Sequence, residues 1–214
     1  MTYEIDPATL AGLVTHEVRA GSRDGVATRI AVARRTYPTG QDDLWDAVTN
    51  PERIPRWFLP VSGSLEVGGR YQLEGNAGGV IEACEEPTSF AVTWEYGDQV
   101  SWLSVTLSPT VDGTTLELAH EAVVDPDFWP RFGPGAVGLG WDLGLVGLGW
   151  HLDSGASVDP EVGLGFPLTP EGRAFLSAAG ASWAEAAIAG GDDPVAAREA
   201  AERAVAFFTT VPEE

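Results

Sequence analysis

His120 is the residue with the clearest potential for chemistry, because a histidine side chain can transfer protons near neutral pH. Glu121 follows it directly, and Asp142 is a further carboxylate that could complete a catalytic group. Neighbouring residues of a strand point to opposite faces, however, so Glu121 is poorly placed to orient His120. A single histidine on an apolar face is more often a structural or cavity-lining residue than a catalytic one. We therefore assign no catalytic residue and retain His120 only as a candidate.

The other reactive residue types form no recognisable catalytic or metal-binding motif. His16, His120 and His151 are far apart in the sequence, and neither His-x-His nor Cys-x-x-Cys occurs, so no metal site is predicted. The only cysteine, Cys84, lies near two glutamates whose charges disfavour a thiolate, and we expect an inert buried thiol. The glycine-rich segments at 75–79 and 133–149 lack the pattern of a phosphate-binding loop. No cofactor is therefore expected.

The composition limits the classes of partner that the chain can bind. The 214 residues include 32 acidic and 12 basic ones, which gives a formal net charge of −20. Binding to nucleic acid or to an anionic membrane depends on cationic side chains, so neither is expected. An apolar content of 44% and eight tryptophans exclude a disordered chain. No basic segment followed by an apolar run is visible at the start of the sequence, and we expect a cytoplasmic protein.

The first two thirds of the sequence read as strands with two short helices between them. Asp24-Gly25 separates two alternating segments and predicts a hairpin whose second arm is a long strand over 28–37. Acidic residues open a helix that ends at Asn50-Pro51, and a second short helix follows up to Phe58. Six short segments separated by turn residues then predict an antiparallel meander. Its strands are expected at Ser64–Val67, Arg70–Glu74, Val80–Cys84, Phe90–Tyr96, Ser101–Ser108 and Thr114–Glu121.

Helices are predicted for the rest of the chain. A long apolar helix is expected from Gly135 to Leu152, and Asp142 is the only aspartate, glutamate, lysine or arginine within it. Its glycines make it too polar for a membrane span and permit close packing, so we expect it to be buried inside a soluble protein. Residues 153–168 read as a linker. Thr169-Pro170-Glu171 and Asp193-Pro194 are helix starts, and they predict an alanine-rich helical hairpin.

Six segments of the chain, taken together, form a specific pattern. They are Leu44–Phe58, Val67–Tyr71, Gly79–Glu82, Val92–Glu95, Gly113–Glu121 and Gly140-Trp141. This pattern resembles the START-like, or SRPBCC, superfamily, and in particular its branch related to the activator of heat shock protein 90 ATPase. The resemblance covers about Thr28 to Leu152.

The resemblance implies an α+β helix-grip fold, similar to that of the birch-pollen allergen. In this fold a curved antiparallel sheet wraps around a long C-terminal helix. We expect an N-terminal lead and hairpin arm over 1–27, the START-like domain over 28–152, and a linker with a C-terminal helical appendage over 153–214. The appendage departs from the minimal family pattern. It is expected to cover an apolar patch, to form a homodimer interface or to close the cavity as a lid.

The cavity of the superfamily implies binding of a small hydrophobic or aromatic molecule between the sheet and the long helix. One alternative is a protein-interaction module that binds a chaperone or another protein. Another is an enzyme similar to polyketide cyclases and dehydratases, acting without a metal or nucleotide cofactor. We favour binding over catalysis, and both over chaperone activation. The residues expected to line the ligand site are Trp57, Phe58, Tyr71, Phe90, Trp94, Tyr96, Leu103, Val105, Leu118, His120, Trp141 and Leu145.

Overall fold

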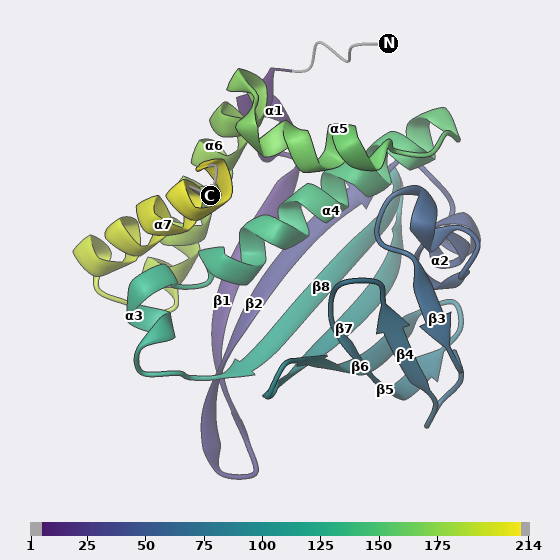
Figure 1. Cartoon of the computed structure of the whole chain (residues 1–214), viewed down its shortest axis with the longest axis horizontal. Coiled ribbons are helices and arrows are strands. Elements are labelled where there is room, and N and C mark those ends of the chain that lie inside the picture. Colours follow the sequence, from purple (N-terminus) through teal and green to yellow (C-terminus); the bar gives the residue numbers. More distant parts are fainter. Residues whose placement is uncertain (1–5, 211–214) are drawn as a thin grey trace. The chain divides into compact units, whose positions relative to one another are not determined.

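The computed structural model describes residues 6–210. The chain divides into two compact units, each assembled from segments that are distant in sequence. Figure 1 labels the helices and strands along the chain. Unit 1 contains Met1–Ala33, Val124–Val146 and Asp159–Glu214, and unit 2 contains Arg34–Val123 and Gly147–Val158. The fold is α+β and of the helix-grip class, with a curved antiparallel sheet and long C-terminal helices, which confirms the expected fold class. Within residues 6–210, no helix has the length and apolar character needed to span a membrane.

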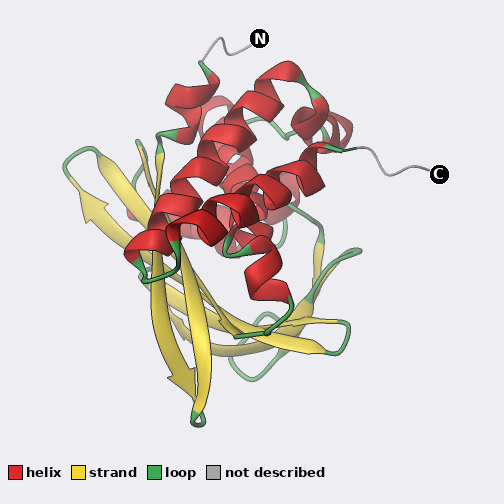
Figure 2. Ribbon diagram, turned by 90° about the vertical axis from the view of Figure 1, so that its left-hand side faces the viewer, coloured by secondary structure: helices red, strands yellow, loops and turns green. Residues whose placement is uncertain are grey.

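Eight strands form one sheet in the order β1-β2-β8-β7-β6-β5-β4-β3. The strands, yellow in Figure 2, twist along the sheet. Asp24 and Gly25 connect the first two strands with φ angles of 52° and 80°, the backbone that a tight hairpin turn requires, so the predicted hairpin is confirmed. The strands are β1 (Val14–Arg23), β2 (Val26–Tyr37), β3 (Val61–Gly63), β4 (Arg70–Leu73), β5 (Gly78–Glu85), β6 (Ser89–Tyr96), β7 (Gln99–Thr110) and β8 (Gly113–Val123).

The register of β6, β7 and β8 gives this part of the sheet one apolar and one polar face. Val92 is paired with Leu103, which is paired with His120, and Phe90, Val105 and Leu118 are aligned in the same way. Because successive side chains of a strand alternate, all of these residues lie on one face, which we call the apolar face. The residues between them, such as Thr93, Trp102 and Glu121, belong to the opposite face. The predicted antiparallel meander is therefore confirmed for these three strands.

The helices of unit 2 are joined by a network around Arg53. This residue lies between α2 (Gln41–Thr49) and the 3₁₀ helix η1 (Ile54–Arg56). Its guanidinium donates hydrogen bonds to the carboxylates of Asp43 and Asp46 at 2.7 and 3.0 Å, and its Nε donates to Nε2 of His151 at 3.1 Å. His151 lies on the last part of the long helix α4 (Gly135–Ser154), so Arg53 ties three helices together.

Glycines of α4 allow this last part of the helix to approach its neighbours in unit 2. A Cβ atom at Gly147 would lie 2.9 Å from the carbonyl oxygen of Trp57, and one at Gly149 would lie 2.5 Å from the guanidinium of Arg35 on β2. Either distance is shorter than a side chain tolerates. The close approach expected from the glycine-rich sequence therefore occurs here.

Unit 1 contains most of the remaining helices. They are α1 (Pro7–Ala11), α3 (Phe128–Phe132), α5 (Pro160–Gly165), the 3₁₀ helix η2 (Phe166–Leu168), α6 (Pro170–Ala189) and α7 (Pro194–Thr209). Asp6, Thr169 and Asp193 accept hydrogen bonds from backbone N–H groups at the starts of α1, α6 and α7. The helix starts predicted at Thr169 and Asp193 are therefore confirmed. Phe175 and Trp183 of α6 are at most 1% exposed, and α6 packs against α1, β1 and α7.

Two predicted elements are wrong. Residues 64–67 do not form a strand, because the chain turns at Gly63 with a φ of 113° and the amide of Gly68 hydrogen-bonds instead to the carbonyl of Ile81. The strand of this region is β3. Residues 153–168 are also not a plain linker, because Asp159 accepts a hydrogen bond from the amide of Glu161 and starts α5. Asp159-Pro160 carries the same start signal as Thr169-Pro170.

Candidate functional site

The most distinctive feature of the apolar face is a polar pair within it. Nε2 of His120 on β8 lies 2.8 Å from Oγ of Ser101 on β7. The Ser101 hydroxyl also donates a hydrogen bond to the carbonyl oxygen of Trp94 at 3.1 Å. Since the only hydroxyl proton is used in that bond, Nε2 of His120 must carry a hydrogen and donate it to Ser101. The Trp94 ring meets the His120 ring edge to face, with 6.0 Å between centroids.

Burial keeps His120 neutral. The residue is 4% exposed, and desolvation lowers the pKa of its imidazole to about 4. A group with this pKa is uncharged at neutral pH and a poor proton acceptor. His120 is therefore suited to fixed hydrogen bonding and poorly suited to general-base catalysis.

Aromatic and aliphatic side chains surround the polar pair. Leu103, Val105 and Leu118 are buried, whereas Phe90 and Trp94 are half-buried. Phe90 also meets Trp45 of α2 edge to face at 6.1 Å. Because the rings of Phe90 and Trp94 are only half-buried, the part of the apolar face that they form is partly exposed.

Tyr71 lies on β4 in the same unit. Its hydroxyl donates a hydrogen bond to the carbonyl oxygen of Thr93 at 2.8 Å. Burial, assisted by the charge of Glu95, raises the pKa of the phenol above its ordinary value. Tyr71 is thus a neutral donor that is engaged with the backbone of β6.

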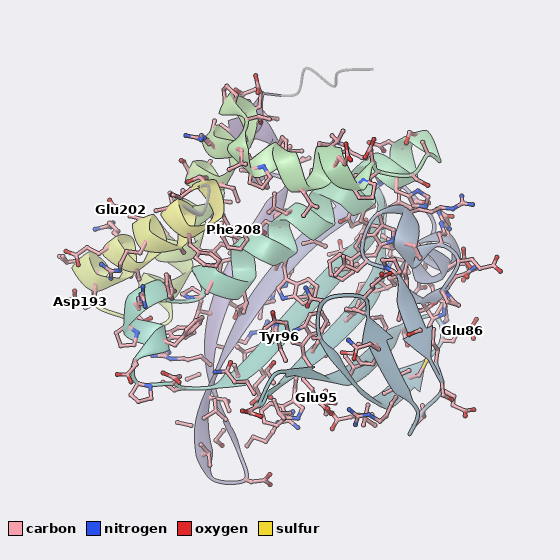
Figure 3. All side chains as sticks on the ribbon, in the orientation of Figure 1. Glu86, Glu95, Tyr96, Asp193, Glu202 and Phe208 are labelled. Carbon is pink, nitrogen blue, oxygen red and sulfur yellow. The ribbon has the colours of Figure 1, made fainter. Side chains whose placement is uncertain are left out.

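Three other predicted site residues also lie in unit 2. Trp57 donates a hydrogen bond from Nε1 to the carbonyl oxygen of Ala47 at 2.9 Å and stacks on Phe58 at 5.4 Å. Tyr96, labelled beside Glu95 in Figure 3, lies at the end of β6 and is 63% exposed, so it does not line a buried interior. Among the predicted site residues, Trp141 and Leu145 belong to the α4 segment of unit 1, where Trp141 is half-buried and Leu145 is buried.

Unit 1 contains a buried polar cluster that the sequence analysis missed. Nε2 of His16 on β1 lies 2.9 Å from Oδ1 of Asp142 on α4, and Oδ2 of Asp142 accepts a hydrogen bond from Nε1 of Trp183 at 2.9 Å. Nδ1 of His16 lies 2.8 Å from Oγ of Ser182, and the His16 and Trp183 rings are 4.2 Å apart. The available signal was Asp142 itself, because a lone carboxylate in an apolar helix needs hydrogen-bond donors.

This cluster contains the residue types of a hydrolase triad but lacks two of its requirements. The side chains of His16 and Asp142 are only 0% and 1% exposed, so a substrate has no access to them. Ser182 lies inside α6, where backbone N–H groups are used in the helix and cannot form an oxyanion hole. We interpret the cluster as structural. Both carboxylate oxygens of Asp142 accept hydrogen bonds within this cluster.

The expectation for Cys84 is wrong. Its side chain is exposed, because it lies near the end of β5 after a register shift between Ile81 and Ala83. Among residues 6–210, no group of three or more histidine, cysteine, aspartate or glutamate side chains is arranged to hold a metal ion.

The segment from residue 38 to residue 145 matches the model of one protein family, described as activator of Hsp90 ATPase homolog 1-like protein. The match covers half of the chain and includes α2 and strands β3 to β8. The chain belongs to this family. Its membership confirms the resemblance predicted from the six sequence segments.

Solved structures related to this family member include those of CalU16 from Micromonospora echinospora. The solution structure is 30% identical with a TM-score of 0.69, and the alignment covers 83% of this chain and 96% of CalU16. The crystal structure is 29% identical with a TM-score of 0.64, covering 81% and 97%. Protein MLL2253 from Mesorhizobium loti is 26% identical with a TM-score of 0.53, covering 58% and 97%. No functionally curated protein matches the sequence.

The CalU16 alignment extends beyond the START-like core. Residues 28–152 are 125 of the 214 residues, a smaller share than CalU16 covers. CalU16 therefore shares part of the segments that lie outside residues 28–152.

Proposed function

We propose that unit 2 binds a small aromatic molecule with a hydroxyl group on the apolar face of β6, β7 and β8. Family membership and the helix-grip fold support a ligand-binding role of this general kind. The observation that carries the proposal is the His120–Ser101 pair beside the half-buried ring of Trp94. Ligand sites typically combine an apolar lining with a few fixed polar groups, and this face has that composition.

The hydrogen bonds that Ser101 already makes determine which group of a ligand it can bind. A serine hydroxyl has one donor and two acceptor positions. Ser101 uses its donor on the carbonyl of Trp94 and accepts one hydrogen bond from His120. The second acceptor position of Ser101 suits a hydrogen bond donated by the O–H group of a phenol. An aromatic ring carrying that phenol would pack against Trp94, whose face and edge favour offset or perpendicular ring contacts.

The electrostatics favour binding over a cyclase-like reaction at His120. A general base works best when its pKa lies near the operating pH. The pKa of His120 is lowered to about 4, so the imidazole is neutral at pH 7 and holds its hydrogen bond to Ser101 without accepting a proton.

Calorimetry with 2-naphthol and naphthalene tests the proposal, because the two probes differ only in the hydroxyl group. A net hydrogen bond of about 0.5–1.5 kcal/mol predicts that 2-naphthol binds roughly 2–12-fold more tightly. Ser101→Ala should abolish this preference while the binding of naphthalene persists. Trp94→Ala should weaken both probes by about tenfold, a loss of ~1.4 kcal/mol that is typical of an aromatic contact.

Trp102→Ala is the matched control, since Trp102 is a half-buried tryptophan on the opposite face of β7. It should leave the binding of both probes unchanged. If neither probe binds the wild-type protein, or if Trp94→Ala and Trp102→Ala weaken binding equally, the apolar face is not a ligand site.

A further inference from the structure

The helical hairpin of unit 1 carries an open groove. Helices α6 and α7 are connected through Gly190–Asp193, run antiparallel and lie side by side (Figure 1). Between them is a groove of about 550 Å³. The helices approach closely along its floor, because a Cβ atom at Gly180 would lie 2.5 Å from Cγ2 of Val205.

Small side chains form the floor and walls of this groove. Gly180, Ala184 and Ala201 are buried at its base, and Ala181 and Ala206 are exposed at its sides. Larger side chains of α6, such as Phe175 and Trp183, are buried in unit 1 and do not line the groove. A groove between two antiparallel helices with a floor of glycine and alanine fits the ridge of a third helix, since small residues allow helix axes to approach within about 8 Å.

The net charge of the hairpin indicates which charge a partner bound in the groove should carry. Residues 170–209 contain six acidic and three basic residues, a net charge of −3 within a chain of net charge −20. At the groove, Arg198 is paired with Glu185 at 3.0 Å, which leaves Glu202 to set the local sign. Glu202, labelled in Figure 3, is exposed on α7. The rim is therefore acidic and complements a cationic partner.

We propose that this groove binds an amphipathic helix that has leucine-sized apolar residues on one face and lysine or arginine on the other. The apolar residues occupy the alanine-lined groove, and the cations face Glu202 and the acidic hairpin. A second copy of this chain is a poorer occupant, because each copy has a charge of −20 and presents the same acidic rim.

The test uses a fluorescent peptide with leucine at positions i, i+3, i+4 and i+7 and lysine elsewhere. Its control is the same peptide with glutamate in place of lysine. Fluorescence anisotropy should show micromolar binding of the lysine peptide and at least tenfold weaker binding of the glutamate peptide. Affinity should fall as salt is raised from 50 to 500 mM, because the Debye length shortens. Glu202→Arg should lower the affinity several-fold.

Two tryptophan substitutions locate the binding site. Ala181→Trp fills the groove and should reduce affinity at least tenfold, whereas Ala196→Trp, at an exposed alanine of α7 outside the groove, should have no effect. Equal affinity of both variants would show that the lysine peptide is attracted only by the overall negative charge, and it would overturn the proposal. The proposal would also be overturned if the lysine peptide did not bind the wild-type protein. Sedimentation that shows a dimer lost in Ala181→Trp would replace the cationic helix by a second copy as the occupant.

Discussion

Replacing Asp142 tests the buried cluster of unit 1. This residue is 0% exposed, and its two carboxylate oxygens accept hydrogen bonds from His16 and Trp183, each at 2.9 Å. Asp142→Ala leaves both donors buried without an acceptor. Asp142→Asn keeps one carbonyl oxygen for Trp183 and provides an N–H₂ group that can donate to His16. The imidazole would then carry its hydrogen on Nδ1 and donate to Ser182, so both ring nitrogens of His16 and the indole N–H of Trp183 keep a partner.

The two substitutions should therefore differ in cost. A buried donor left unsatisfied costs about 1–3 kcal/mol, and Asp142→Ala creates two of them. Asp142→Asn loses the charge assistance of its hydrogen bonds and brings one amide hydrogen that has no acceptor among these partners, about 1–3 kcal/mol in all. Against a typical stability of about 5–15 kcal/mol, the difference between the variants is measurable.

Urea unfolding followed by far-UV circular dichroism and by tryptophan fluorescence is the appropriate measurement. Asp142→Ala should unfold at a clearly lower urea concentration than Asp142→Asn, and both below wild type. Glu199→Ala, which removes an exposed partner of Arg203 at 3.5 Å, is the control and should change stability by less than ~1 kcal/mol. If Asp142→Ala and the control unfold at the same urea concentration, the carboxylate does not hold the cluster together.

Three further outcomes follow from the structure. Gly138→Ala would place a Cβ atom 2.3 Å from the Trp183 ring and should cost about 1–3 kcal/mol in urea unfolding, whereas Gly165→Ala, with open space around it, should be near neutral. The pKa of His120 is about 4 when folded and near 6.5 when unfolded, so the unfolded chain binds more protons between these values. Stability should therefore fall as pH drops from 6.5 to 4, and the His120 ring resonances should not titrate between pH 5 and 8; a midpoint near 6.5 would contradict the burial. Cys84 is exposed and should react completely with a thiol reagent in the native protein; protection until unfolding would show that it is buried.

The sequence predicts the sheet well because its signal is local. Alternation places Val92, Leu103 and His120 on the same side of their strands, and the register aligns them as neighbours. The turn at Asp24-Gly25 is equally local, since both residues tolerate a positive φ. These features depend on residues that are close in sequence, so they need no knowledge of the tertiary structure.

Predictions failed where a tertiary contact or a boundary decided the outcome. The segment 64–67 has the composition of a strand, but the backbone hydrogen bond from Gly68 to Ile81 holds it as a loop. Cys84 has the position of a buried strand residue, but the register shift and the strand end expose it. In both places the alternation was present in the sequence, but it did not by itself determine the structure.

For the candidate site, too, the sequence predicts local features and misses those that depend on packing. The sequence placed His120 among apolar side chains but could not show that Ser101, on the adjacent strand, would accept its hydrogen bond. His16 and Asp142 are 126 positions apart, and the sequence around neither residue predicts a hydrogen bond to the other. Polar pairs of this kind are fixed by packing, so sequence patterns identify one member and leave the other open.

The family segment at residues 44–58 helps to hold unit 2 together. Arg53 binds two carboxylates of α2 and the imidazole of His151, and Trp57 hydrogen-bonds to the carbonyl of Ala47. Since Arg53 and Trp57 are engaged with the protein itself, this segment contributes to the fold of unit 2. Under the proposed function, the choice of ligand depends on residues of the apolar face such as Ser101, where one substitution changes the hydrogen-bonding capacity.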